Sequence, residues 1–200
     1  MKELQLRVLE ILSRGCLTTG AAVQLLGITD SRAGYALRSL WREGLAWRYR
    51  VGRIDVWCRG PPGAVGVLCG GRVVYVSIRR LARAAIALVQ QGVRALRPAE
   101  LFGLHCSTHY GLVRRLLASM LDGCAVEDRR SGRHVLLITD LRCVLERLGR
   151  LAEDGRLQLS PLPPPPLPPP RPRWPTCRGI TSRLSTSWSG AESSPTGARQ

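Results

Sequence analysis

Apolar residues in the first part of the chain recur with a period that changes from helical to strand-like in a definite order. Three helical stretches come first, and the apolar face of the third consists of Ala33, Ala36, Leu37 and Leu40. Asp30 or Ser31 is expected to cap this third helix, and Gly44 to end it. Two short strand-like runs follow and are joined by residues 51–53 as a basic hairpin. The predicted elements are helices over 2–14, 18–27 and 30–44 and strands over 46–50 and 54–57.

The same order of periods returns in the second half of the chain. Pro98 opens a short helix that Gly103 ends, and Ser107 or Thr108 is expected to cap the longer helix that follows. The apolar stripe of that longer helix consists of Val113, Leu116, Leu117 and Met120. Two strands then flank a basic hairpin tip, residues 129–133, in which a glycine supplies the turn. The predicted elements are helices over 77–91, 98–103 and 107–123 and strands over 125–126 and 135–138.

Helix, turn, helix and basic hairpin is the order of a winged helix-turn-helix, which both stretches resemble. The phrase ALRSLWREGL at residues 36–45 resembles the recognition helix and wing of archaeal and bacterial transcription regulators of the MarR-like and ArsR-like group. The second copy departs from this phrase, because Leu117 and Met120 approach Gly123 with a different spacing. The resemblance covers residues 1–152 and implies a mainly α fold with small β-hairpin wings, which is an α+β class.

Composition shifts divide the chain into four segments. A Gly-Pro-Pro-Gly breaker at residues 60–63 separates the two units, and two β-prone runs around Gly70 and Gly71 suggest an extra hairpin after it. From residue 155 onward the chain is rich in proline, serine and arginine and has no apolar periodicity, so we expect disorder there. The predicted domains are winged helix-turn-helix unit 1 at 1–59, a linker at 60–76, unit 2 with a terminal helix at 77–154, and a proline-rich basic tail at 155–200.

The charge of the chain favours a polyanionic partner. Its net charge is +16 with a pI near 11.1, and Lys2 is the only lysine among 30 basic residues. The codon composition of a GC-rich genome explains part of the preference for arginine over lysine. It does not explain the excess of basic over acidic residues. Double-stranded DNA is therefore the first expected partner, and an anionic membrane surface the second.

Helical-wheel geometry selects the candidate DNA contacts. The side chains that face away from the apolar stripe of each long helix are hydroxyls, a tyrosine, a glycine and arginines, which suit the major groove. Arginines in the two hairpins suit phosphates or a neighbouring minor groove. In the first unit the candidates are Ser31, Arg32, Tyr35, Arg38, Arg42, Arg48, Arg50 and Arg53. In the second unit they are Ser107, Thr108, Gly111, Arg114, Arg115, Arg129, Arg130 and Arg133.

Two other kinds of site, a metal site and an active site, are alternatives to DNA contact. His105, Cys106, His109 and Cys124 are residue types that bind zinc, but their spacing matches no closed zinc motif. No paired carboxylates and no glycine-rich phosphate loop occur, since GVLCGGR lacks the GKT or GKS ending. The sequence therefore predicts no metal, no cofactor and no enzymatic activity.

The seven cysteines are scattered with no CxxC motif, which favours reduced thiols inside a cell. The first residues mix acids and bases as a soluble helix does, and no apolar run is long enough for a membrane span. We therefore expect a cytoplasmic, nucleoid-associated protein without membrane contact.

The apolar stripe of the terminal helix has two open interpretations. Residues 140–152 either form a homodimer or pack on their own domain. The function also has two candidates. One is sequence-specific binding of double-stranded DNA by a transcription regulator, through two recognition helices and basic wings. The other is a tandem winged-helix docking module of a transcription or replication complex, with only non-specific nucleic-acid contact.

Overall fold

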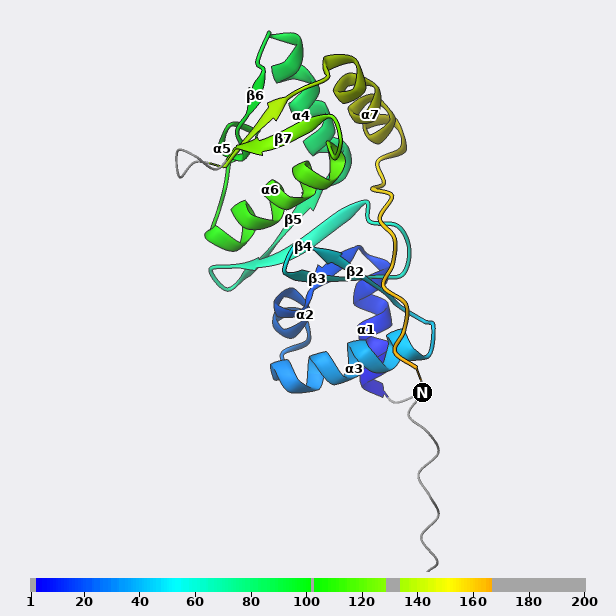
Figure 1. The fold of residues 1–200 in the computed structure, drawn as a ribbon. Coiled ribbons are helices and arrows are strands. Elements are labelled where there is room, and N and C mark those ends of the chain that lie inside the picture. Colours follow the sequence, from blue (N-terminus) through cyan, green and yellow to red (C-terminus); the bar gives the residue numbers. More distant parts are fainter. Residues whose placement is uncertain (1–2, 102, 129–133, 167–200) are drawn as a thin grey trace, which may run out of the picture. The chain divides into compact units, whose positions relative to one another are not determined.

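The structure is a computed structural model that describes residues 3–101, 103–128 and 134–166 (Figure 1). In these residues the chain is mixed α/β, consistent with the predicted α+β class, and its strands form two sheets. The helices are α1 (Glu3–Ser13), α2 (Thr19–Leu26), α3 (Asp30–Arg42), α4 (Ile78–Gln90), α5 (Pro98–Leu101), α6 (Ser107–Met120) and α7 (Leu141–Asp154). The strands are β1 (Cys16–Thr18), β2 (Trp47–Val51), β3 (Ile54–Cys58), β4 (Ala64–Cys69), β5 (Arg72–Ser77), β6 (Ala95–Leu96), β7 (Ala125–Asp128) and β8 (Val135–Ile138).

An order of helix, strand, two helices and a hairpin occurs twice. The first repeat, residues 3–58, runs α1-β1-α2-α3-β2-β3, and the second repeat, residues 78–138, runs α4-β6-α5-α6-β7-β8. The strand pairing repeats as well, since the three strands lie in the order β2-β3-β1 in one repeat and β7-β8-β6 in the other, all antiparallel. The predicted helices and hairpin strands of both halves are therefore confirmed within three residues of their expected ends.

The segment predicted as a linker, residues 60–76, belongs to the first sheet. Strands β4 and β5 form an antiparallel hairpin, and β4 pairs in parallel with β1 through Cys16↔Val65 and Leu17↔Gly66. The first sheet thus has five strands in the order β2-β3-β1-β4-β5. The hairpin extends a sheet instead of spanning a gap between two separate domains.

Both faces of this five-stranded sheet are buried. Helices α1, α2 and α3 cover one face around Val8, Leu37 and Trp57. On the other face, Val67 of β4 and Leu112 of α6 belong to a second apolar cluster that includes the helices of the second repeat. The two repeats therefore share a core, and all the described residues belong to one compact unit.

The starts of the two long helices differ from the predicted caps. Helix α3 has its N-cap at Thr29, which makes no side-chain capping bond, and Asp30 is already helical. Helix α6 has its N-cap at Cys106, whose Sγ accepts a hydrogen bond from the His109 N–H at 3.3 Å. Cysteine is not among the residues preferred as N-caps, so the sequence favours the two hydroxyl residues that follow it, Ser107 and Thr108.

The six described cysteines form three disulfides, which corrects the expectation of reduced thiols. Cys16–Cys58 joins β1 to β3, and Cys69–Cys106 joins the end of β4 to the start of α6. The third, Cys124–Cys143, joins the residue before β7 to the first turn of α7. Disulfides persist in oxidising compartments and in intracellular proteins of hyperthermophiles, so scattered cysteines no longer argue for a reducing compartment.

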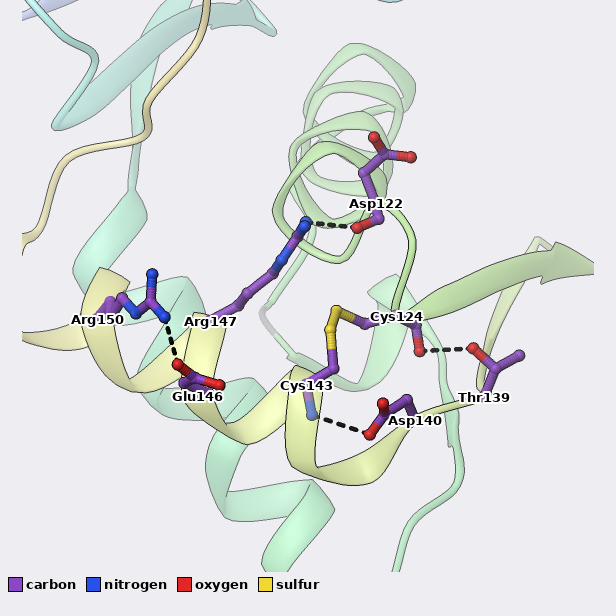
Figure 2. Close-up of a disulfide and its surroundings, with 8 residues drawn as sticks. All are labelled: Asp122, Cys124, Thr139, Asp140, Cys143, Glu146, Arg147 and Arg150. Carbon is purple, nitrogen blue, oxygen red and sulfur yellow. Dashed lines mark hydrogen bonds and ion pairs between the residues drawn. A yellow bond between two sulfur atoms is a disulfide. The ribbon is translucent and has the colours of Figure 1, made fainter.

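Helix α7 packs on α4 of the same chain, which is one of the two interpretations of its apolar stripe. Val144 and Leu148 are completely buried there. Figure 2 shows how the helix start is fixed, with Cys143 bonded to Cys124 and its N–H donating to the Asp140 carboxylate at 3.0 Å. Asp140 is thus the N-cap of α7. A homodimer through residues 140–152 stays a prediction.

The chain after α7 returns to the first repeat as a C-terminal strap, residues 155–166. Leu157 is 4% exposed, and its N–H donates to the Pro62 carbonyl at 2.8 Å. Farther along, the Leu162 N–H donates to the Arg48 carbonyl at 2.8 Å, and the Trp41 indole N–H donates to the Leu162 carbonyl at 3.1 Å. The predicted disordered tail therefore does not begin at residue 155, because the strap is bound to β2 and α3.

No helix in the described ranges has the combination of length and apolar character that crossing a bilayer requires.

Candidate nucleic-acid interface

The outer face of α3 carries the predicted contacts of the first repeat in the expected orientation. The opposite face is buried through Ala33, Leu37 and Leu40, which turns the polar positions toward solvent. Tyr35 is 62% exposed, and the three arginines of this face make no ion pair with any described residue. The exposed set is Ser31, Arg32, Tyr35, Arg38 and Arg42. We call it the α3 face.

The side chain of Arg38 runs along its own helix toward the N-terminus. A Cβ added at Gly34 would be 3.2 Å from the Arg38 Nη1 atom, so the guanidinium covers this glycine one turn earlier. Long helical side chains normally point toward the helix N-terminus in this way. The charge of Arg38 therefore lies over the N-terminal half of α3, near Gly34.

The arginines of the β2–β3 hairpin differ in their burial and in their ion pairs. Arg48 is mostly buried, forms a 2.7 Å ion pair with Asp55, and lies over the rings of Trp41 and Trp57 at 5.1 and 5.4 Å. It is a structural residue that holds the hairpin to α3. Arg50 pairs with the same carboxylate at 2.6 Å but is half-exposed.

At the hairpin tip, Arg53 is exposed and makes no ion pair with the described residues. Of the three predicted hairpin contacts, it is therefore the one best placed to meet a phosphate.

Helix α6 presents a different surface from α3. Ser107 and Thr108 at its start are exposed, whereas Gly111 is half-buried. The predicted inward stripe of Val113, Leu116, Leu117 and Met120 is buried as expected, together with Leu112 and His109. The inner face is thus confirmed, while the two arginines of the outer face, Arg114 and Arg115, contact other parts of the protein.

Arg114 is held by side chains of its own repeat. Its Nη1 atom lies 3.1 Å from Glu127 Oε1 on β7 and 2.5 Å from His134 Nδ1, and Glu127 also contacts this histidine at 3.0 Å. The side chains of Arg114 and Glu127 are each only about one fifth exposed, at 20% and 22%. The charge of Arg114 is therefore largely neutralised inside the fold.

Arg115 lies against the first repeat. A Cβ at Gly52, in the β2–β3 turn, would be 2.5 Å from Arg115 Cδ and 2.6 Å from its Nε. Burial is the largest cause that lowers the pKa of this arginine, followed by the nearby charges of Arg114 and Arg53, while Glu127 raises it. Arg115 is therefore close to the charged tip of the first hairpin. The remaining predicted contacts of this repeat, Arg129, Arg130 and Arg133, lie outside the described residues.

A groove of about 1090 Å³ between α1 and α3 was not predicted from the sequence. Glu3, Arg7 and Tyr35 line it, and Gln5 beneath it donates through Nε2 to Ser39 Oγ and Glu43 Oε1, both at 3.0 Å. A signal for this network existed in the sequence. Gln5 occupies the buried stripe of α1 with Val8 and Leu12, where a polar residue requires partners.

The candidate zinc ligands are not brought together as four donors. Cys106 and Cys124 are committed to different disulfides, and the described residues contain no cluster of three metal-ligating side chains. His105 and His109 stack on each other with ring centroids 5.4 Å apart. The His109 Nδ1 atom accepts the His105 backbone N–H at 3.3 Å, so this histidine has a structural partner.

Comparison with known proteins identified one similar solved structure. No protein-family model matches the chain, and no curated protein matches it significantly. The structure of the hypothetical protein PyrSV_gp04 from Pyrobaculum spherical virus is similar with a TM-score of 0.48 and 16% sequence identity. The alignment covers 67% of this chain and 92% of the viral chain.

Proposed function

We propose that this protein binds double-stranded DNA through the α3 face, as a transcription regulator with a winged helix-turn-helix in each repeat. In this proposal Arg32, Tyr35 and Arg38 contact base edges in the major groove, and Arg42 and Arg53 contact phosphates. The observation that carries it is the α3 face itself. Its three arginines, on one exposed side of a helix, make no ion pair with a described residue.

Two further features support the proposal. The order of helices, strands and hairpin in each repeat is the one expected for winged helices, and α3 stands where the recognition helix stands in that order. The net charge of +16 favours a polyanionic partner over a neutral one. An arginine that keeps its charge unpaired on a surface is available for bidentate contact with guanine or phosphate.

The test is competition binding of a selected duplex to the wild-type chain and to Arg38→Gln. We expect the variant to lose about 1–3 kcal/mol of binding free energy at the selected site, the range for one bidentate base contact. Arg83→Gln is the matched control, because Arg83 is an exposed arginine on α4 outside the α3 face. Equal affinity of both variants and the wild type would contradict base contact by α3.

The groove between α1 and α3 favours docking to a protein as a second candidate function. It combines apolar side chains with groups of both charges, a mixture that suits a protein surface better than a phosphate backbone. These side chains are Leu4, Ile28, Glu3, Glu43, Arg7 and Arg32. A salt titration separates the two functions, because phosphate contacts make the affinity for any duplex fall steeply with salt. A chain with no measurable affinity for random duplex, and hence no such slope, is a docking module for a transcription or replication protein.

A further inference from the structure

We propose that Arg53 and Arg115 form one composite phosphate site, in which the β2–β3 hairpin tip and helix α6 hold a single phosphate group between them. The inference rests on the proposed DNA binding for the source of the phosphate, but the site itself is defined by the contact between the two repeats. It assigns the second repeat a role that differs from reading a second DNA segment.

The close approach of Arg115 to the hairpin is the first observation. Gly52 has a φ of +62°, a left-handed conformation that favours glycine, and its missing Cβ leaves room for the side chain of Arg115. The Nε and Cζ atoms of this arginine would lie 2.6 and 3.1 Å from such a Cβ. The guanidinium therefore lies directly over the turn that also presents Arg53.

The charge balance at this place is the second observation. The charges of Arg114 and Arg53 both act on Arg115, yet neither Arg53 nor Arg115 makes a hydrogen bond or ion pair with a described residue. Glu127, the carboxylate that acts on Arg115, already contacts Arg114 and His134. Arg115 is partly buried and Arg53 is exposed, and bringing their like charges together is unfavourable unless an anion offsets them.

Phosphate is the anion that suits these groups best. Guanidinium groups offer planar pairs of N–H donors that match two phosphate oxygens, and a doubly or singly charged oxyanion would neutralise the pair. Two chemical sources fit, a phosphodiester of duplex DNA and a free polyphosphate. Both would use the same two side chains.

The test is a salt titration of duplex binding by Arg53→Gln, Arg115→Gln and the double variant. If both arginines hold one phosphate, each single variant lowers the log–log salt slope by about 0.9, and the double variant lowers it by the same amount. A decrease twice as large in the double variant means two separate phosphates and overturns the composite site. Unchanged slopes overturn it as well. Arg83→Gln, with the same charge change on α4, is expected to keep the wild-type slope.

A second probe, sodium tripolyphosphate, separates the two sources and does not depend on DNA. The expected result is a rise in the melting temperature of the wild type that Arg53→Gln abolishes and Arg83→Gln keeps. Because Arg53 is exposed, this variant also carries the test if Arg115→Gln does not fold. No rise in the wild type, together with an unchanged salt slope in Arg53→Gln, overturns the site.

Failure of the site and failure of the proposed function give different results. If Arg38→Gln weakens duplex binding while Arg53→Gln and Arg115→Gln keep the wild-type slope, DNA binding stands and the composite site is wrong. If the wild type binds no duplex, the proposed function is wrong. Stabilisation by tripolyphosphate that depends on Arg53 then supports a site for free polyphosphate, and its absence overturns the site too.

Discussion

Helices α3 and α6 occupy the same place in the two repeats but have different surroundings. The outer face of α3 is exposed, and its three arginines make no ion pair with a described residue. The outer face of α6 is used internally, with Arg114 paired to Glu127 and Arg115 packed over Gly52. The same polar pattern on a helical wheel has thus produced one available surface and one that is largely occupied.

The two helices are also fastened in different ways. On the inner side of α3, Trp41 binds the C-terminal strap through its indole N–H. The start of α6 is instead bonded to β4 by the Cys69–Cys106 disulfide, which lies beside His109. Helix α6 is held between the two repeats and is suited to positioning the neighbouring hairpin. Helix α3 is supported on its inner side only and is suited to contacting a partner. The difference suggests unequal roles for two similar repeats.

Removing the disulfide at α6 should have the largest effect on this comparison. Replacing both Cys69 and Cys106 with alanine opens a loop with a sequence separation of 37, which is expected to cost about 4 kcal/mol of unfolding free energy. The measurement is urea unfolding under non-reducing conditions. The matched control replaces Cys16 and Cys58, whose separation is 42. Both variants should lose stability, but only the first should reduce the salt slope that depends on Arg115. Equal slopes would mean that the disulfide does not position α6.

Removing the strap should have the next largest effect, because the strap supports α3 on its inner side. A chain ending at residue 155 loses the buried Leu157, the contact of Leu162 with Trp41, and two backbone hydrogen bonds to Pro62 and Arg48. We expect a loss of about 3 kcal/mol of unfolding free energy. The control is a chain ending at residue 166, which keeps all of these contacts and should unfold like the full chain. Equal stability of both truncations would show that the strap contributes nothing.

The sequence predicted the elements of both repeats well because apolar periodicity reports which face of a helix or strand is buried. Val113, Leu116 and Leu117 were placed correctly for this reason. What a wheel cannot report is what lies opposite an outward side chain. The contact of Arg115 with Gly52 joins positions far apart in the sequence, so only the fold reveals it.

The strap and the disulfides were missed for similar reasons. A run of prolines has no helical or strand period, and the sequence alone did not show that Leu157 and Leu162 would each pack against an apolar cluster of the fold. Cysteine spacing alone does not fix a pairing, and without a CxxC motif the six described cysteines gave no sign of three bonds.

A single substitution on β7 should give α6 an arginine without an ion pair, as α3 has, with a smaller effect than the two changes above. Glu127→Gln removes the charge that neutralises Arg114, so the guanidinium becomes available to a phosphate. We expect the affinity for random duplex to rise about fivefold, or about 1 kcal/mol, and stability to fall by up to about 1 kcal/mol. Glu146→Gln is the control, since Glu146 pairs with Arg150 on α7 and the net charge changes equally (Figure 2). Equal gains in the two variants would mean that net charge alone is responsible.

The smallest expected effect concerns His109, a buried titratable group in the first turn of α6. Burial is the main cause that lowers its pKa below the usual 6.5, and the neighbouring His105 adds to the shift. A proton on Nδ1 would also displace the hydrogen bond from the His105 N–H and place a positive charge at the positive end of the helix.

Since the unfolded chain takes up this proton more readily than the folded one, stability is fully present above about pH 6.5 and declines as the pH falls toward the lower pKa of the folded state. Urea unfolding at several pH values should show this decline in the wild type and a weaker one in His109→Gln. His105→Gln is the informative control, because it removes the secondary cause and leaves burial in place. It should keep most of the decline, since burial is the larger cause. An identical decline in His109→Gln and the wild type would mean that other groups set the acid sensitivity of the α6 end.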